Sequence, residues 1–587
     1  MWGEKRESSR AYDVLVIGSG AGGLAAAVTA RKAGLNVAVL EKESWFGGTT
    51  AFSGGILWVP GNAHAARNGI EDSEAAVHAY LKQEAGNHYR ADLVDAYLEN
   101  GPAMLDFFER ETEVKFIPTL YPDYHPEAPG GVPIGRSVAA EAYDGRHLGK
   151  EFKRLRPPLS TITFMGMMFN SANTDLKHFF NFTRSATSAA YVAKRLATHL
   201  WHMANYGRGV QLTSGNALAA RLARSAFDAG IPILTDVDVR SLVVQEGRVR
   251  GVTARIGGET VRLDARRAVV LATGGFAHEA ARLARVYPHV ARGGTHLSPV
   301  PEGNVGDGIR MAEQAGARFE AGYSSAAAWM PVSAVPLGGG KTGVFPHLVD
   351  RYKPGFIIVT RQGRRFTNES NSYHDVGLAM QKACEGEAET AAWLICDRRT
   401  IAKYGMGYAK PAPLPLTPHL RSGYLRRGRT LRNLAVAAGI DPGALEATVA
   451  RFNEGAERGE DLEFGRGSTA FNRYLGDAEH RPNPCVGPIK AGPFYALKLI
   501  MGDLGTFDGV ATDAQARVLD ASDRPIPGLY AVGNDAASMM GGAYPGAGIT
   551  LGPAMTFGYI AARHIAGLAP EPGDLAATPL PDTEVAQ

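Results

Sequence analysis

The chain has 587 residues, 45% hydrophobic and 21% charged, so it is too long for one hydrophobic core and should form more than one domain. The formal net charge of +3 is small for this length and gives no support for nucleic-acid binding. The three cysteines, Cys384, Cys396 and Cys485, lack the spacing of a zinc or haem site, so we expect no metal. They suit a reducing cytoplasm, where we expect the protein to be.

A glycine-rich turn joins the first predicted strand to the first predicted helix. Residues 12–17 read YDVLVI, typical of a buried parallel strand, and the small residues after the turn predict a helix ending near Gly34. A second strand, residues 36–42, carries Glu41 at its end, and this acid could accept hydrogen bonds from a ribose. The turn carries the dinucleotide-binding fingerprint, in which glycines permit a tight turn, close approach to a pyrophosphate and close helix packing. The expected contacts here are Gly18, Ser19, Gly20, Ala21, Gly22, Gly23, Glu41 and Lys42.

Three later stretches indicate that the dinucleotide is FAD rather than NAD. WFGGTT at 45–50 resembles the second glycine pair of a large superfamily of flavoprotein reductases. AVVLATGG at 268–275 and GLYAVGND at 528–535 resemble the later FAD contacts of that superfamily. The further FAD contacts expected are Gly47, Gly48, Thr49, Thr50, Ser53, Gly54, Gly55, Ala272, Thr273, Gly274, Gly533, Asn534, Asp535, Gly548, Ile549 and Leu551.

Two missing features refine the cofactor chemistry. No histidine occurs between Gly47 and Pro60, where covalently flavinylated members of the superfamily carry one, so we expect non-covalent FAD. We find no second strand–GxGxxG–helix unit and therefore expect no nicotinamide domain. Electrons are then expected to pass to a quinone or another acceptor.

The positions of these motifs predict an α/β fold in which the Rossmann-type FAD-binding domain is assembled from both ends of the chain. Its parts should be residues 1–286 and 500–587. An inserted α+β catalytic domain, residues 287–499, should cap the flavin and leave a cleft for the substrate. Residues 211–252 read as a helix followed by strand, turn and strand, and in the superfamily this element lies beside the adenosine. Val239 would supply a backbone contact there.

Further stretches narrow the family: YPDYHPEAPGGVPIGRSVAAE (121–141), RRFTNESNSYHDVGLAM (364–380), and segments 502–520 and 533–564. Together they closely resemble the 3-ketosteroid Δ1-dehydrogenases, except for extra length at 150–209. That family removes two hydrogens from ring A of a 3-ketosteroid and leaves a C1–C2 double bond. The resemblance therefore implies an FAD-dependent dehydrogenase.

The resemblance also implies the roles of individual residues. Tyr544 and the N–H of Gly548 resemble the pair that binds the ketone oxygen, and Tyr373 resembles the base that takes the C2 proton. Tyr124 resembles the hydrogen-bonded partner of that base, with Tyr121 close by as the alternative. A proton next to a ketone is weakly acidic, so two donors must stabilise the developing enolate. A tyrosine, with a reference pKa of about 10, needs a neighbour that favours its phenolate.

A dicarboxylate and a smaller cyclic ketone are the two alternatives to a 3-ketosteroid substrate. Fumarate reductases of the same superfamily place an arginine where this chain has Tyr544 and a histidine near Gly502. Both cations are missing, which disfavours a dicarboxylate because its charge would be left unpaired. Desaturation of a smaller ring such as cyclohexanone remains an alternative to a 3-ketosteroid, because the sequence does not determine the size of the pocket.

The extra segment 150–209 combines apolar and cationic residues. We expect FMGMMF at 164–169 to form an exposed apolar patch. It is followed by Phe179, Phe180 and Phe182, and few acids lie nearby. Such a composition is typical of an interfacial membrane contact, while a lid or a subunit contact is an equally good interpretation. The chain shows no apolar run near the roughly 20 residues of a membrane-spanning helix. The cations of the segment are Lys150, Lys153, Arg154, Arg156, Lys177, Arg184, Lys194, Arg195 and Arg208.

Overall fold

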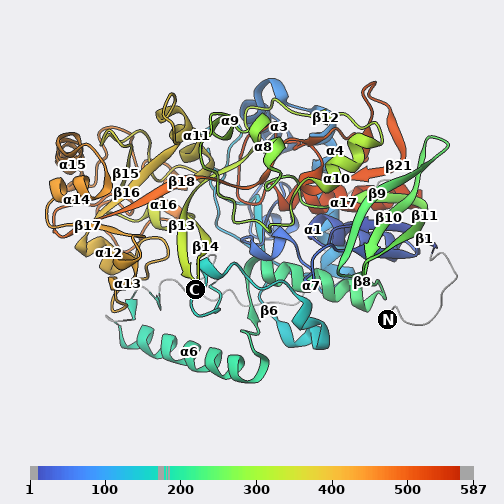
Figure 1. Cartoon of the computed structure of the whole chain (residues 1–587), viewed down its shortest axis with the longest axis horizontal. Coiled ribbons are helices and arrows are strands. Elements are labelled where there is room, and N and C mark those ends of the chain that lie inside the picture. Colours follow the sequence, from blue (N-terminus) through green and yellow to red (C-terminus); the bar gives the residue numbers. More distant parts are fainter. Residues whose placement is uncertain (1–10, 170–177, 180, 183–184, 569–587) are drawn as a thin grey trace.

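The computed structural model describes residues 11–169, 178–179, 181–182 and 185–568. Phe180, Lys177 and Arg184, which were considered above, lie outside the described residues, as does the end of the expected segment 500–587. The chain folds around two sheets, one at each side of the molecule in Figure 1. The predicted α/β fold is confirmed.

The larger sheet contains eight strands in the described part of the chain. Its parallel centre runs in the order β21 (Pro525–Ala531), β11 (Glu259–Leu271), β1 (Ala11–Ile17), β2 (Val37–Leu40), β8 (Ile233–Leu234). The antiparallel strands are β9 (Val237–Gln245), β10 (Arg248–Ile256) and β20 (Arg517–Leu519). The two ends of the chain therefore build one sheet, because β21 pairs with β11 beside β1 (Figure 1).

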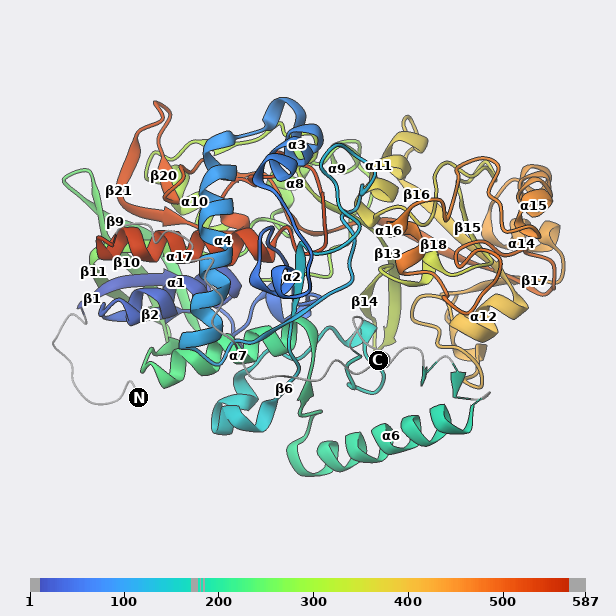
Figure 2. The ribbon, with the colours of Figure 1, turned by 180° about the vertical axis from the view of Figure 1, so that it is seen from behind.

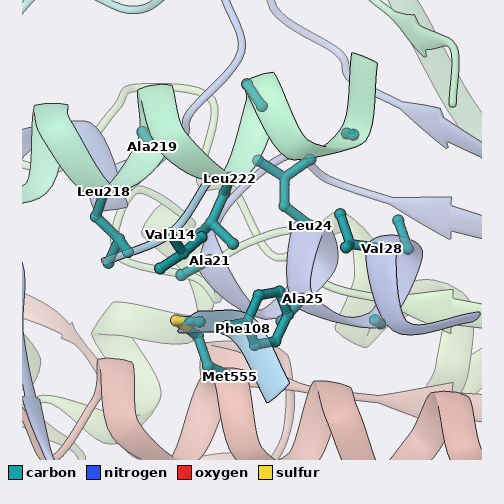
Figure 3. Packing of buried hydrophobic residues seen from close by; sticks show 14 of the residues in the cluster. Ala21, Leu24, Ala25, Val28, Phe108, Val114, Leu218, Ala219, Leu222 and Met555 are labelled. Atoms are coloured by element: carbon teal, nitrogen blue, oxygen red, sulfur yellow. The ribbon is translucent and has the colours of Figure 1, made fainter. Parts of the chain in front are cut away.

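Both faces of β1 are buried, which explains its continuous apolar sequence. Val14 and Val16 belong to a cluster with α1 (Ala21–Lys32), α7 (Ser214–Asp228) and α17 (Leu551–Ala566). Figure 3 shows small side chains of α1 packed between α7 and Met555 of α17. A Cβ on Gly558 would lie 2.6 Å from the carbonyl oxygen of Gly22, so glycine is needed where α17 crosses α1.

The second sheet contains β14 (Lys341–Pro346), β13 (Ala327–Gly338), β18 (Phe494–Thr506), β16 (Ala391–Asp397) and β15 (Phe356–Val359), in that order, with β17 (Arg426–Gly428) beside β18. Its strands pair antiparallel. The expected boundary at residue 500 falls inside β18. Helices of this part are α11 (Tyr373–Ala383), α12 (Arg398–Tyr404), α13 (Thr417–Arg421), α14 (Leu431–Ala438), α15 (Pro442–Ala456) and α16 (Ala470–Tyr474).

A smaller sheet and several helices lie between these two sheets. The small sheet has the order β3 (Ile56–Trp58), β5 (Ser137–Ala140), β4 (Phe116–Pro118). The long helix α4 (Ala91–Glu111) crosses the molecule beside α17, as Figure 2 shows. Other elements are α2 (Ala63–Arg67), α3 (Glu74–Ala85), α8 (Ala280–Val286), α9 (Pro288–Ala291), α10 (Asp307–Gln314) and the short pairs β6 (Tyr143–Asp144) with β7 (Gln211–Leu212) and β12 (Phe319–Glu320) with β19 (Gly509–Val510).

The extra segment forms α6 (Ala186–Tyr206), which runs along the outer edge of the molecule (Figures 1 and 2). The expectation of an exposed apolar patch at 164–169 is wrong for Met167, whose side chain is buried against the rest of the molecule. Met165 is 64% exposed. Among the described helices, none has both the length and the apolar character needed to cross a membrane. The exposed apolar side chains of α6 are Leu200, Trp201, Met203 and Tyr206.

Candidate active site

A cavity of about 300 Å³ lies between the two sheets and joins the fingerprint turn to a group of tyrosines. The predicted residues that line it are Gly18, Ser19, Gly20, Ala21, Gly22, Gly23, Glu41, Lys42, Gly48, Thr49, Thr50, Ser53, Gly54, Val239, Ala272, Thr273, Gly274, Gly533, Asn534, Gly548, Leu551, Tyr124, Tyr373 and Tyr544. Residues that lie far apart in the sequence therefore meet at one site.

The fingerprint turn forms an anion-binding cradle at the start of α1. A Cβ on Gly23 would lie 2.2 Å from the carbonyl oxygen of Gly18, so the helix can approach the strand only with glycine there. A Cβ on Gly20 would meet one atom within 4 Å, Oγ1 of Thr50 at 3.6 Å, because this side of the turn faces the cavity. The N–H of Ala21 donates to the same Oγ1 at 2.9 Å. First-turn amides of a helix have no partner within the helix and carry the positive end of its dipole, which suits a pyrophosphate.

Glu41 is held rigidly at the end of β2. Its Oε2 accepts from the N–H of Ser19 at 3.1 Å and the hydroxyl of Ser19 at 2.5 Å, and its Oε1 accepts from the N–H of Glu43 at 2.9 Å. Burial raises the pKa of this carboxyl, and the hydrogen bonds partly offset that effect. Cradle and acid together fit the diphosphate and ribose of a dinucleotide.

Four predicted contacts, Gly47, Gly55, Asp535 and Ile549, do not line the cavity. Asp535 is fully buried and accepts from the N–H of Thr273 at 2.5 Å and from the N–H of Gly275 at 3.0 Å. The N–H of Gly47 donates to the hydroxyl of Ser19 at 2.9 Å. The structure therefore places Asp535 and Gly47 behind the wall, where they orient residues that do face the cavity.

Asn304 is a lining residue that the sequence did not reveal. Its Nδ2 donates to Oγ1 of Thr49 at 2.9 Å and to the carbonyl oxygen of Gly274 at 3.0 Å. It thereby links two of the predicted contact stretches. No sequence motif marks it, because it lies in a loop of the middle of the chain and reaches the cavity only after folding.

The three predicted tyrosines come together in the cavity. The hydroxyl of Tyr124 donates to that of Tyr373 at 3.3 Å. The rings of Tyr124 and Tyr544 are stacked with centroids 5.4 Å apart, and those of Tyr373 and Tyr544 meet edge to face at 5.0 Å. Tyr121 also lines the cavity and packs against Tyr474. The hydrogen bond favours Tyr124 over Tyr121 as the partner of Tyr373.

Hydrogen bonds to the backbone hold the loop of Tyr124 next to the loop of Tyr544. The N–H of Tyr124 and the hydroxyl of Tyr80 both donate to the carbonyl oxygen of Pro545, at 2.8 Å and 2.6 Å. Next to Tyr124, the buried carboxylate of Asp123 accepts from Nη1 of Arg136 at 2.7 Å. The hydrogen bonds to Pro545 anchor the Tyr124 loop beside the Tyr544 loop, although the two tyrosines are more than 400 residues apart in sequence.

Tyr373 is the first residue of α11, and the preceding turn is held by a buried ionic cluster. Ser372 caps the helix by accepting from the N–H of Asp375 at 3.1 Å. Glu369 is fully buried between Arg365, at 2.7 Å, and Arg466, at 3.2 Å. Removing one member of such a cluster would leave a buried charge uncompensated.

Gly548 presents its backbone to the same space. Its φ is +99°, and a Cβ there would lie 2.5 Å from the carbonyl oxygen of Ile56. Glycine is therefore required at this position. The residue lines the cavity close to the start of α17, the helix that begins at Leu551.

Burial keeps the phenols of the site neutral. It raises the pKa of Tyr544 to about 12 and the pKa of Tyr373 well above its usual value, with the adjacent phenols of Tyr124 and Tyr544 adding to the second shift. The hydrogen bonds of Tyr373 with Tyr124 and Tyr544 raise its pKa further rather than offset its burial. Tyr352, which sequence inspection missed, also lines the cavity, and its oxygen accepts from Nη2 of Arg351 at 2.8 Å.

Comparisons with known proteins show the family to which the chain belongs. Residues 13–551 match the family described as FAD binding domain. The chain is 44% identical over 568 residues to a 4-oxocyclohex-2-ene-1-carboxylate 5-dehydrogenase of Sinomonas cyclohexanicum, covering 96% of this chain and 95% of the relative. It is 38% identical over 573 residues to a 3-oxosteroid 1-dehydrogenase of Mycolicibacterium smegmatis, covering 95% and 98%.

A solved structure is similar over nearly the whole chain. It is a 3-ketosteroid Δ1-dehydrogenase from Sterolibacterium denitrificans in complex with 1,4-androstadiene-3,17-dione, with a TM-score of 0.87 and 37% identity. The match covers 95% of this chain and 100% of that chain. The chain therefore belongs to the FAD binding domain family, and it is an FAD-dependent dehydrogenase.

Proposed function

We propose that this enzyme desaturates a cyclic ketone next to its carbonyl group, with a 3-ketosteroid as the first candidate substrate. The observation that carries the proposal is the convergence of Tyr373, Tyr544 and Gly548 on the cavity that holds the FAD fingerprint. These three groups supply a base and two oxyanion donors. Bound FAD would accept the hydride released from the neighbouring carbon.

The ketone oxygen would lie between the hydroxyl of Tyr544 and the N–H of Gly548. Both groups donate hydrogen bonds, and the donors strengthen their interaction as negative charge develops on the oxygen. Because burial raises the pKa of Tyr544 to about 12, this phenol keeps its proton throughout the neutral range. The two donors would thereby make the α-proton of the ketone more acidic.

Tyr373 would take that proton as its phenolate, which would accept a hydrogen bond from the Tyr124 hydroxyl 3.3 Å away. The raised pKa of Tyr373 means that its phenolate is scarce at neutral pH and becomes more abundant as the pH increases. We therefore expect the rate of proton removal to increase towards alkaline pH. We further propose that FAD is held without a covalent bond and that a quinone or another acceptor reoxidises it.

The lining of the tyrosine end supports a neutral ring rather than a dicarboxylate. Tyr121, Phe471 and Leu475 lie there, and the described part of this end includes no basic side chain. His296 pairs with Met501, the residue before Gly502, but its Nε2 contacts Asp503 at 2.8 Å and it does not line the cavity. A fumarate-type substrate would lack its cationic partners.

A second candidate substrate is a smaller ring that bears a carboxylate. The 44% identity to the Sinomonas enzyme, whose name specifies such a ring, favours it. The chemistry at the ketone would be the same for both candidates. They differ in what must bind the far end of the molecule.

Anaerobic mixing of the oxidised enzyme with ketones tests this proposal. We expect a 3-ketosteroid, or 4-oxocyclohexanecarboxylate, to bleach the flavin absorbance near its visible maximum and to yield the ring with a new double bond. Fumarate added to the reduced enzyme should not restore the colour. Failure of every cyclic ketone to reduce the flavin would refute the proposed reaction.

We also propose that α6 contacts an anionic membrane surface. Residues 185–209 contain no acid, and Lys194 accompanies the exposed side chains of Leu200 and Trp201. Apolar side chains bordered by cations suit a lipid interface.

The double variant Leu200→Ser/Trp201→Ser should lose cosedimentation with anionic vesicles. Leu462→Ser, which changes a residue that is 61% exposed elsewhere, should not. Unchanged vesicle binding with a shift in oligomeric state would indicate a subunit contact instead.

A further inference from the structure

Arg156 is a buried cation in the wall of the cavity. The residue is 7% exposed, so it cannot belong to an exposed cationic border of the extra segment. In the described structure its Nε is buried without a hydrogen-bond acceptor. The carboxylate oxygen that approaches it there, Oε2 of Glu43, is 3.9 Å from Nη2, too far for a hydrogen bond.

The other buried arginines of the described chain are bonded quite differently. Each donates to carboxylate, carbonyl or hydroxyl oxygens at ordinary hydrogen-bond distances. Arg156 is thus an exception among the buried arginines of the described residues. The bonded residues are Arg136, Arg221, Arg282, Arg351, Arg365 and Arg466.

A buried guanidinium whose charge is only partly compensated is unfavourable unless an anion joins it. Burial lowers the pKa of Arg156, and the charges of Glu41 and Glu43 only partly oppose this shift. The aromatic rings of Trp45 and Phe52 lie 5.9 Å and 5.7 Å from the guanidinium carbon, which confines the side chain. The backbone is fixed as well, since the carbonyl oxygen of Arg156 accepts from Nδ2 of Asn216 at 2.8 Å.

We propose that Arg156 binds an oxyanion inside the cavity. One source is a phosphate of FAD. Phe52, next to the guanidinium, ends the turn that starts at Thr49. Thr50 of that turn accepts a hydrogen bond from the first residue of α1, the helix end that suits a pyrophosphate. The other source is the carboxylate of a keto acid substrate, and this source rests on the proposed function. Both ligands offer the planar guanidinium two oxygens for charge-assisted hydrogen bonds.

Binding of FAD to the apoprotein, followed by quenching of flavin fluorescence, tests the phosphate source without any turnover. Arg156→Met keeps a long apolar stem and removes the charge, and it should weaken FAD binding roughly 10- to 100-fold. Arg156→Lys should recover part of that loss. Arg154→Met is the matched control, because Arg154 bonds to Glu151 and to the carbonyl oxygen of Ile233 and does not line the cavity.

The carboxylate source is tested with FAD saturating. Binding of 4-oxocyclohexanecarboxylate and of uncharged 4-methylcyclohexanone is measured by anaerobic equilibrium dialysis against the enzyme with its flavin already reduced, so that the ketone binds but is not oxidised. If Arg156 holds the substrate, Arg156→Met should weaken the keto acid roughly 10- to 100-fold and leave the uncharged ketone unchanged.

Either selective loss supports an oxyanion site and identifies its ligand. Unchanged binding of both FAD and the keto acid in a folded Arg156→Met protein would overturn the proposal. If that variant does not fold, Arg156→Lys decides, since loss of the planar fork should still weaken the relevant ligand several-fold. The FAD measurement remains decisive even if no ketone proves to be a substrate.

Discussion

Tyr373→Phe should bind a cyclic ketone almost normally and yet reduce its flavin very slowly. Tyr544 and Gly548 remain to hold the ketone oxygen, whereas the group that takes the α-proton is gone. Loss of a general base costs about 10²–10⁴ in rate. Stopped-flow flavin absorbance gives the rate of reduction, and titration of the flavin spectrum gives the binding constant.

Exchange of the α-hydrogen with deuterated water isolates the proton-transfer step. It should fall together with flavin reduction in Tyr373→Phe, and the increase of the wild-type rate with pH should disappear. Tyr124→Phe should show a milder defect because the phenolate loses only a supporting hydrogen bond. Tyr121→Phe changes a phenol in the same cavity and should affect exchange much less. Normal exchange in Tyr373→Phe would assign the base to another residue.

Tyr544→Phe should reduce turnover about 10²–10³-fold because it deletes one of the two proposed oxyanion donors. The pKa of this phenol, raised to about 12, leaves it protonated below that value. A donor that stays protonated is present at every neutral pH, so the defect should be the same across the neutral range. The rate of flavin reduction by a saturating ketone, measured at several pH values, checks both statements.

Two controls distinguish loss of an oxyanion donor in Tyr544→Phe from a general disturbance of the cavity. FAD content should be unchanged, since the phenol faces the tyrosine group rather than the fingerprint turn. Tyr352→Phe offers a comparison, because it removes a buried phenol of the same cavity that is bonded to Arg351. Equal losses in the two variants would indicate a general packing effect and not an oxyanion donor.

The sequence alone determined the cofactor and the fold class. Short-range patterns carried this information, because a strand, a glycine turn, a helix and an acid are consecutive, and the local spacing of Gly18, Gly23 and Glu41 reflects one compact unit. The stretches around Tyr124, Tyr373 and Tyr544 could be identified by resemblance to a family. Their mutual distances could not be known from it.

Only the tertiary structure decided which residues share the cavity and which support it from behind. Asp535 and Gly47 belong to FAD motifs, yet they lie outside the cavity and are hydrogen-bonded to Thr273 and Ser19, which line it. Arg156, by contrast, looked like one cation among many and proved to be buried in the wall. The reason is that side-chain direction and burial depend on contacts between distant segments, such as Asn216 with Arg156, and these contacts exist only once the chain has folded.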